Sequence, residues 1–99
     1  MTSPSVEAVP ARCAFLTSHA RLLLAIADAP GATVRDLATR VEVTERQAHR
    51  LLDDLVAAGY VVRKRVGRRN RYDVRAARPM PDPVVDHAAV GDLLVAMLR

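Results

Sequence analysis

The sequence predicts a mainly α-helical fold with one small β-hairpin, and three observations support that fold class. Hydrophobic residues make up 51% of the chain but aromatic residues only 3%, so the core must consist of Leu, Val and Ala side chains, which suit packed helices better than a β-sandwich. Three segments place apolar residues at helical spacing behind a threonine that can cap a helix. Two short β-like runs then follow Gly59 and flank a glycine-containing tip.

The chain of 99 residues has room for one small domain with a single core. Residues 1–14 contain two prolines and many small side chains, which predicts a flexible arm. We expect residues 15–78 to form the main domain, and residues 79–99 to form a proline-rich linker followed by a C-terminal helix.

The first two helices are predicted from their caps. Thr17 is the expected N-cap of a helix that continues through Asp28, and the Pro-Gly pair at 30–31 then stops it. Thr33 caps a shorter second helix, in which Asp36 at the third position can accept hydrogen bonds from first-turn amides. The side chains expected to face inward are Leu22, Leu23 and Ile26 in the first helix and Val34, Leu37, Ala38 and Val41 in the second.

A third helix has two faces of opposite character. Thr44 and Gln47 form the T-x-x-Q capping box that opens it, and it is expected to end at Ala58, with Gly59 in the left-handed position that follows a helix. The inward stripe is Ala48, Leu51, Leu52 and Leu55. The polar face almost opposite carries Arg46, Arg50 and Asp53, with His49 beside them.

A hairpin is expected next, with strands at 60–66 and 71–75 and a tip at 67–70. Gly67 and Asn70 both tolerate the positive φ that tight hairpins demand. Tyr72 alternates inward across the second strand, and we assign it to the core rather than to base stacking. Three prolines between residues 79 and 83 then break regular structure, and residues 84–99 return to helix.

Positive charge is concentrated on the hairpin and the residues just after it. The whole chain has a net charge of +4, but residues 60–78 hold eight basic residues and one acid, so the remainder carries −3. This distribution is typical of a surface that binds a polyanion. The alternative is a solvated loop with excess arginine.

The order of elements resembles the winged helix-turn-helix, and within that fold the small bacterial MarR/ArsR-like transcriptional regulators. The residues that carry the resemblance run from Thr33 to Val74, TVRDLATRVEVTERQAHRLLDDLVAAGYVVRKRVGRRNRYDV. The resemblance implies a homodimeric DNA-binding protein of the bacterial cytoplasm rather than an enzyme. One departure is Glu42, because relatives usually place glycine in this turn; we expect a strained turn here, at a cost of about 1 kcal/mol.

Within the winged fold, residues 44–58 would be the recognition helix in the major groove. Arg46 and Arg50 lie one turn apart on the outer face, and each could fork onto guanine O6 and N7. Arg50 has an alternative role, an ion pair with Asp53 or Asp54 at helical spacing. The expected contacts of this helix with double-stranded DNA are Thr44, Arg46, Gln47, His49 and Arg50.

The wing, residues 60–75, is expected to contact DNA through Arg68, Arg69 and Arg71 at or beside its tip. Arginine at such a tip can enter the minor groove or hold its phosphates. If one subunit neutralises about three or four phosphates, log K should fall with log[salt] at a slope of roughly −3 per subunit.

The C-terminal helix is the expected dimerisation element, because two winged domains related by a dyad would read a palindrome. Its apolar stripe exceeds what a lone terminal helix needs, and Phe15 and Leu16 could extend it. The alternative is that this helix folds back on its own domain. The residues assigned to the dimer interface are Val90, Leu93, Leu94 and Met97.

Several classes of function are not indicated by these residues. A single cysteine, Cys13, gives no internal disulfide, and the scattered His19, His49 and His87 form no metal-ligand pattern, so no cofactor or metal is expected. A redox role for Cys13 is a lesser possibility. No catalytic constellation and no membrane span are present, and a signal pattern is missing, which favours a soluble cytoplasmic protein that is not an enzyme. A small-molecule effector would find little room outside a dimer interface.

Two other functions fit parts of the pattern. A winged helix can serve as a protein-interaction module in a larger complex, its basic face meeting an acidic partner. Non-specific nucleoid or RNA binding would use the wing without depending on Arg46 and Arg50.

Overall fold

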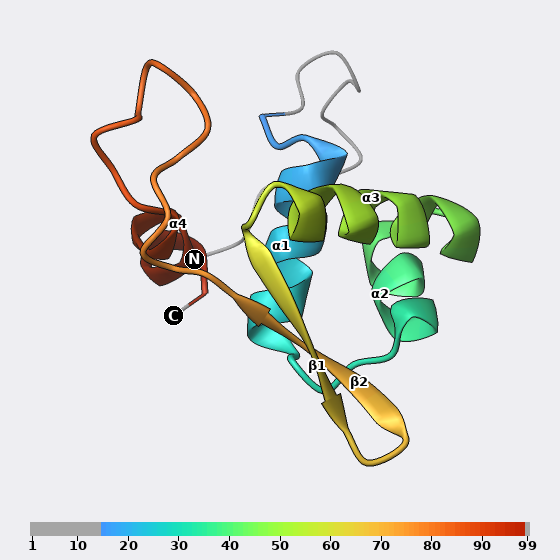
Figure 1. The fold of residues 1–99 in the computed structure, drawn as a ribbon. Coiled ribbons are helices and arrows are strands. Elements are labelled where there is room, and N and C mark those ends of the chain that lie inside the picture. The colour runs from blue at the N-terminus through green and yellow to red at the C-terminus, as the bar shows by residue number, and fades with distance from the viewer. Residues whose placement is uncertain (1–14, 99) are drawn as a thin grey trace, which may run out of the picture.

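The computed structural model describes residues 15–98, and Figure 1 shows helices grouped above a hairpin that extends away from them. The arm at 1–14, including Cys13, lies outside the described residues. The elements within the described part are α1 (Ser18–Asp28), α2 (Val34–Val41), α3 (Glu45–Ala57), β1 (Val61–Val66), β2 (Arg69–Val74) and α4 (Val90–Met97). The predicted fold class, mainly helical with one hairpin, is therefore confirmed.

Each of the first three helices begins at the threonine that the sequence predicts. The Thr17 hydroxyl accepts a hydrogen bond from the amide of Ala20 at 3.1 Å. Thr33 and Asp36 form a reciprocal capping box, and Thr44 and Gln47 form a second one. These caps satisfy amides that have no partner within the helix, so they fix where α1, α2 and α3 start.

The core lies where α1, α2, α3 and the base of the hairpin meet. Every element contributes at least one fully or almost fully buried apolar side chain, and Tyr72 of β2 is only 4% exposed, as expected of a core residue. Val34 and Leu51, predicted to face inward, are partly buried against this core. The largest fully buried side chains are Leu22, Ile26, Leu37, Leu52, Val61 and Val90.

Glu42 ends α2 in the left-handed conformation, with φ 61° and ψ 45°, and among the described residues it alone has a positive φ without being glycine. The turn therefore has the left-handed residue that would carry the expected strain, and the strain itself stays a prediction. Two hydrogen bonds hold the turn: the amide of Val43 donates to Ala38 at 3.0 Å, and that of Glu42 donates to Thr39 at 3.3 Å. They satisfy carbonyls at the helix end that a straight exit would leave free.

The hairpin differs from its prediction in the position of the turn. Val66 pairs with Arg69 and Arg65 pairs with Asn70, so the connection is the two residues Gly67 and Arg68 rather than four. Only Gly67 of these two has a positive φ, at 62°, which is the pattern of a type II′ turn and matches the twist of the strands. Asn70 is therefore a strand residue, and the prediction that the second strand begins at 71 was wrong.

The C-terminal helix is shorter than the predicted 84–99, since it spans only Val90–Met97. The prolines at 81 and 83 and a side-chain turn, in which Asp82 accepts from the amide of Val84 at 2.9 Å, keep the preceding residues out of helical geometry. A bridge between Pro79 and Ala89 closes this segment into a loop. The loop stands beside α4 in Figure 1.

The C-terminal segment packs on the same core as the rest of the described chain. Val90 is buried and Leu94 lies against the core cluster. The hydroxyl of Tyr60 donates to the carbonyl of Pro79 at 3.1 Å, and the amide of Val90 donates to Arg78 at 2.8 Å. At Val90 and Leu94, the helix therefore folds back on its own domain, as in the alternative considered above. The expected domain boundary after residue 78 stays a prediction.

Candidate nucleic-acid interface

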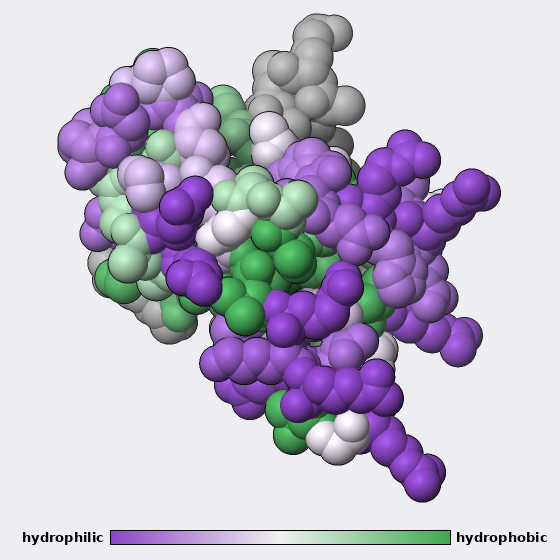
Figure 2. Space-filling view, viewed as in Figure 1, coloured by the Kyte–Doolittle hydropathy of each residue, from purple (hydrophilic) through white to green (hydrophobic). Residues whose placement is uncertain are grey.

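The outer face of α3 carries exposed Arg46, His49 and Arg50. They are exposed because Ala48, Leu52 and Leu55, which are buried, take up the opposite face of the same helix. Among the described residues, the guanidinium groups of Arg46 and Arg50 make no side-chain hydrogen bond or ion pair. In Figure 2 hydrophilic side chains project both over α3 and over the hairpin.

The two aspartates next to this face have partners elsewhere. Asp53 pairs with Arg63 of β1 at 3.1 Å, and Asp54 pairs with His19 of α1 at 2.8 Å. Neither carboxylate binds Arg50, so the alternative role considered for that arginine is not what the structure shows. The pair with Arg63 also reduces the negative charge that the second half of α3 would present to a polyanion.

Thr44 and Gln47 are occupied by capping. The Gln47 side-chain oxygen accepts from the Thr44 amide at 3.0 Å and from the Thr44 hydroxyl at 3.2 Å. The Gln47 amide donates to that same hydroxyl at 3.1 Å. The side-chain oxygen of Gln47 is therefore committed to the helix start, and only its NH₂ group remains as a donor for a ligand. Their contacts to DNA stay predictions.

The three wing arginines singled out in the sequence have different surroundings. Arg68, in the turn, is exposed and makes no side-chain hydrogen bond or ion pair within the described part of the chain. Arg69 donates from Nη2 to the carbonyl of Gly31 at 3.2 Å. Arg71 donates from Nε to Asp73 at 3.1 Å. Of these three arginines, Arg68 alone has no side-chain partner within residues 15–98, which leaves its guanidinium group available to an external anion.

Asp73 forms ion pairs with two basic residues of the hairpin. The hydrogen bond from Arg71 holds the pKa of Asp73 below its ordinary value, with a further contribution from Lys64, whose ammonium lies 3.3 Å from the carboxylate. Register explains the cluster, because Lys64 pairs directly with Arg71 and all three residues share one face of the ribbon. Two cations of the hairpin are thereby partly neutralised.

Sequence reasoning missed the tertiary partners of Arg63 and Arg69. Asp53 and Arg63 lie on different elements, and Gly31 offers only a backbone carbonyl, so neither contact has a spacing signal. The pairing of Arg71 with Asp73 had a detectable signal, since residues two apart in a strand point to the same face.

The residues assigned to dimerisation divide between the core and the surface. Val90 is 1% exposed and Met97 is 56% exposed, while Leu93 and Leu94 are intermediate. The structure therefore places Val90 in its own domain and only the later turns of α4 toward solvent. Phe15, at 98%, and Val95, at 71%, add exposed apolar surface; Val95 lies outside the predicted stripe.

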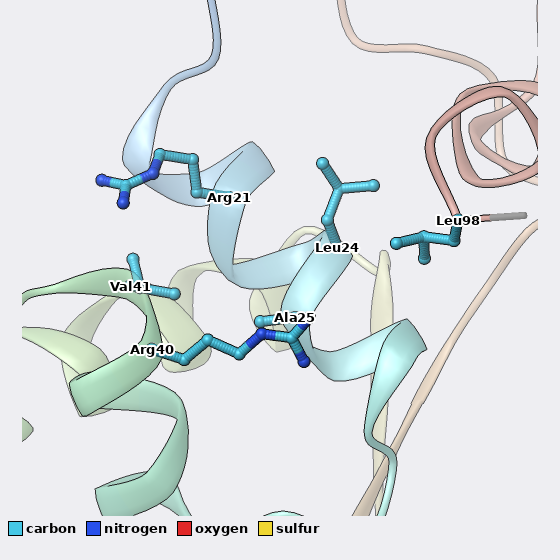
Figure 3. A pocket seen from close by; sticks show the side chains of 6 residues that line it. All are labelled: Arg21, Leu24, Ala25, Arg40, Val41 and Leu98. Atoms are coloured by element: carbon cyan, nitrogen blue, oxygen red, sulfur yellow. The ribbon is translucent and has the colours of Figure 1, made fainter. Parts of the chain in front are cut away.

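Two surface hollows adjoin these elements. One, of about 400 Å³, lies between the end of α3 and the base of the hairpin and is lined by Val56, Gly59, Val61, Val62, Arg63, Arg75 and Arg78. The other, of about 190 Å³, separates α1 and α2 from Leu98, and Figure 3 shows Leu24 and Leu98 on opposite sides of it. The Arg40 side chain beside it is paired with Asp28.

Within residues 15–98 no cluster of His, Cys, Asp and Glu side chains could hold a metal, and none of the helices has the length and apolar character to cross a bilayer.

The described elements define a winged helix domain. Helix α1 packs against α2 and α3, a tight turn joins α2 to α3, α3 carries the exposed arginines, and the cationic hairpin follows it. Residues 16–71 match the model of the MarR family, and the chain belongs to that family. MarR family proteins are winged-helix transcriptional regulators that bind DNA, and they are not enzymes. No curated protein sequence matches the chain.

Proposed function

We propose that the protein is a sequence-specific transcriptional regulator that binds double-stranded DNA as a homodimer in the bacterial cytoplasm. The observation that carries this proposal is the pair of exposed guanidinium groups of Arg46 and Arg50, which have no side-chain partner within residues 15–98 and lie one turn apart on a helix whose other face is buried in the core. A helix of this kind fits the major groove of B-DNA, where an arginine fork recognises guanine.

Each part of α3 has its own task in this proposal. Arg46 and Arg50 read base edges from the first two turns. His49 lies between them on the exposed face, and the NH₂ group of Gln47 remains available beside them. Thr44 places a phosphate at the helix start, where the first-turn amides that its hydroxyl does not cap and the partial positive charge of the helix attract an anion. Beyond Arg50 the surface becomes acidic, so the groove contact ends there.

The wing supplies affinity rather than sequence information. Arg68 lies exposed in the turn, has no side-chain partner in the described part of the chain and is the principal contact to a phosphate or to the minor groove. Arg71 keeps guanidinium N–H groups free, but it shares its charge with Asp73. Contacts of this kind are strongly dependent on salt because they release condensed counterions.

Dimerisation would place two recognition helices on one palindrome. Leu93, Leu94 and Met97 lie on the part of α4 that the domain leaves partly or wholly exposed, and Phe15 adds a large apolar side chain. Covering such surface with a second copy removes apolar area from water, and the transfer free energy favours this burial by roughly 25 cal/mol per Å² before the costs of association are subtracted. A monomer would recognise only one short half-site, which discriminates poorly among many competing sites.

Selection of bound sites from a random duplex pool tests the proposal. The expected result is one enriched motif with dyad symmetry, whose guanines lose their enrichment when Arg46 and Arg50 are both replaced by lysine. Arg21→Lys is the matched control, because Arg21 is an exposed arginine of α1 beside the hollow in Figure 3. Enrichment of the same motif by the Arg46/Arg50 double variant would contradict the proposed reading of bases.

A further inference from the structure

The hairpin extends beyond the helical body, and only its base is buried. In β1, Val61 is buried but every residue from Arg63 onward is exposed. In β2, the three residues before Tyr72 are exposed as well. A ribbon of two strands is at best marginally stable on its own. The direction in which its tip points therefore depends on contacts that reach back to the helices.

Two arginines supply such contacts from opposite faces of the ribbon. Arg63 pairs with Tyr72 and Arg69 pairs with Val66. The two pairs are offset by three positions along the ribbon, and because side chains alternate between faces, this odd offset puts Arg63 and Arg69 on opposite faces. Arg63 donates to Asp53 of α3 at 3.1 Å, and its guanidinium lies 5.7 Å from the centre of the Tyr72 ring. This contact ties β1 to the recognition helix.

Arg69 makes the second tie, to the turn between α1 and α2. Its Nη2 donates to the carbonyl of Gly31 at 3.2 Å. Beside this bond lies a hollow of about 240 Å³, lined by the start of α2 and by the end of the hairpin. The Arg69 side chain thus connects the hairpin to the turn before α2 beside a hollow that no apolar side chains of the described residues fill. Its charge also contributes to the lowered pKa of Asp36, after the larger effect of the hydrogen bonds with Thr33.

We propose that Arg63 and Arg69 are positioning residues that set the angle of the wing, and that Arg68 is the wing residue that contacts a DNA phosphate. The three arginines have the same charge but differ in their contacts. Arg63 and Arg69 donate hydrogen bonds to other elements, whereas Arg68 makes no side-chain hydrogen bond or ion pair within residues 15–98. Holding the ribbon before binding avoids the entropic cost of ordering it on the DNA. The role of Arg68 rests on the proposed function, whereas the positioning role concerns the free protein.

Amide hydrogen exchange of residues 64–70 in the DNA-free protein tests the positioning role. Arg69→Ala and Asp53→Ala should each accelerate exchange in the hairpin about two- to tenfold, the factor expected from losing one such hydrogen bond. Arg68→Gln is the matched control and should exchange like the wild type. Asp53→Ala leaves the hairpin sequence intact and should have the same effect as Arg63→Gln, with no additional effect in the double variant. Unchanged exchange in Arg69→Ala or in Asp53→Ala would overturn the proposal for that tie.

The salt dependence of Kd for a duplex separates positioning from contact. Arg68→Gln should make the slope of log K against log[salt] shallower by about 0.9, as expected for one lost phosphate contact. Arg69→Ala should weaken binding with an unchanged slope, and Arg21→Gln should change neither quantity. A slope change in Arg69→Ala equal to that of Arg68→Gln, with normal hairpin exchange, would overturn the positioning role. If the wild type binds no duplex at low salt, the proposed function and the role of Arg68 fail, while the exchange data still decide the positioning role.

Discussion

Replacing Arg46 and Arg50 together by alanine should abolish discrimination between the operator and random DNA while leaving the fold intact. Both side chains are exposed and make no side-chain hydrogen bond or ion pair among residues 15–98, so their removal should cost the folded protein little, within about 0.5 kcal/mol. In the complex each fork onto guanine is worth about 1–3 kcal/mol. If the two contacts are independent, the double variant loses about 2–6 kcal/mol, or at least about 30-fold in specific affinity.

The assay is fluorescence anisotropy of a labelled duplex that carries the selected site, in parallel with a scrambled duplex of the same length. The expected result is a ratio of the two Kd values that falls toward one, with an unchanged midpoint of urea unfolding. Arg46→Lys with Arg50→Lys is the informative companion, because lysine keeps the charge and loses the fork. That variant should keep the wild-type salt slope and lose the discrimination. Full discrimination by either double variant would refute the assignment of α3 as the helix that reads bases.

Three further predictions follow from single positions. Glu42→Gly should stabilise the protein by up to about 1 kcal/mol in urea unfolding, because glycine adopts the left-handed conformation without strain; a loss of stability would show that the turn is not strained. Because the pKa of Asp73 is lowered in the folded state, chiefly by Arg71, ionised Asp73 favours folding above its unfolded pKa of 3.8, and this contribution is lost as pH falls through the folded value. Asp73→Asn should therefore flatten the acid limb of the stability curve, and a carboxyl titration by NMR at or above 3.8 would contradict the assignment. Met97→Glu should shift sedimentation from dimer to monomer without unfolding the domain, since Met97 is 56% exposed; a variant that remains dimeric would exclude this part of α4 from the interface.

The helical half of the fold could be predicted because its signals are local. Thr17, Thr33 and Thr44 each cap a helix within three residues of sequence, and the apolar spacing behind them fixes which face is buried. The strain at Glu42 was also predictable, because a short connection between α2 and α3 requires a left-handed residue.

The hairpin turn and the C-terminal helix were predicted less well because local rules competed there. Gly67 and Asn70 both suit a turn, and only the pairing of Val66 with Arg69 decides that the turn has two residues. The apolar spacing after residue 84 fitted a helix, but prolines and the Asp82 turn delay it until Val90. Strand register and loop closure depend on tertiary contacts that the local pattern does not contain.

The candidate site was predictable as a surface but not as a set of roles. The exposed face of α3 follows from helical periodicity, and the cationic hairpin follows from composition. The ties from Arg63 to Asp53 and from Arg69 to Gly31 join elements far apart in sequence. Under the proposed roles, those contacts distinguish Arg63 and Arg69, which would hold the wing, from the arginines that would contact DNA.

Selection of bound duplexes from a random pool measures most directly whether one face of this domain reads a DNA sequence. We expect an enriched palindrome with guanines in each half-site, bound at least about a thousandfold more tightly than random duplex at physiological salt. Equal recovery of all sequences, with affinity determined by salt alone, would contradict it.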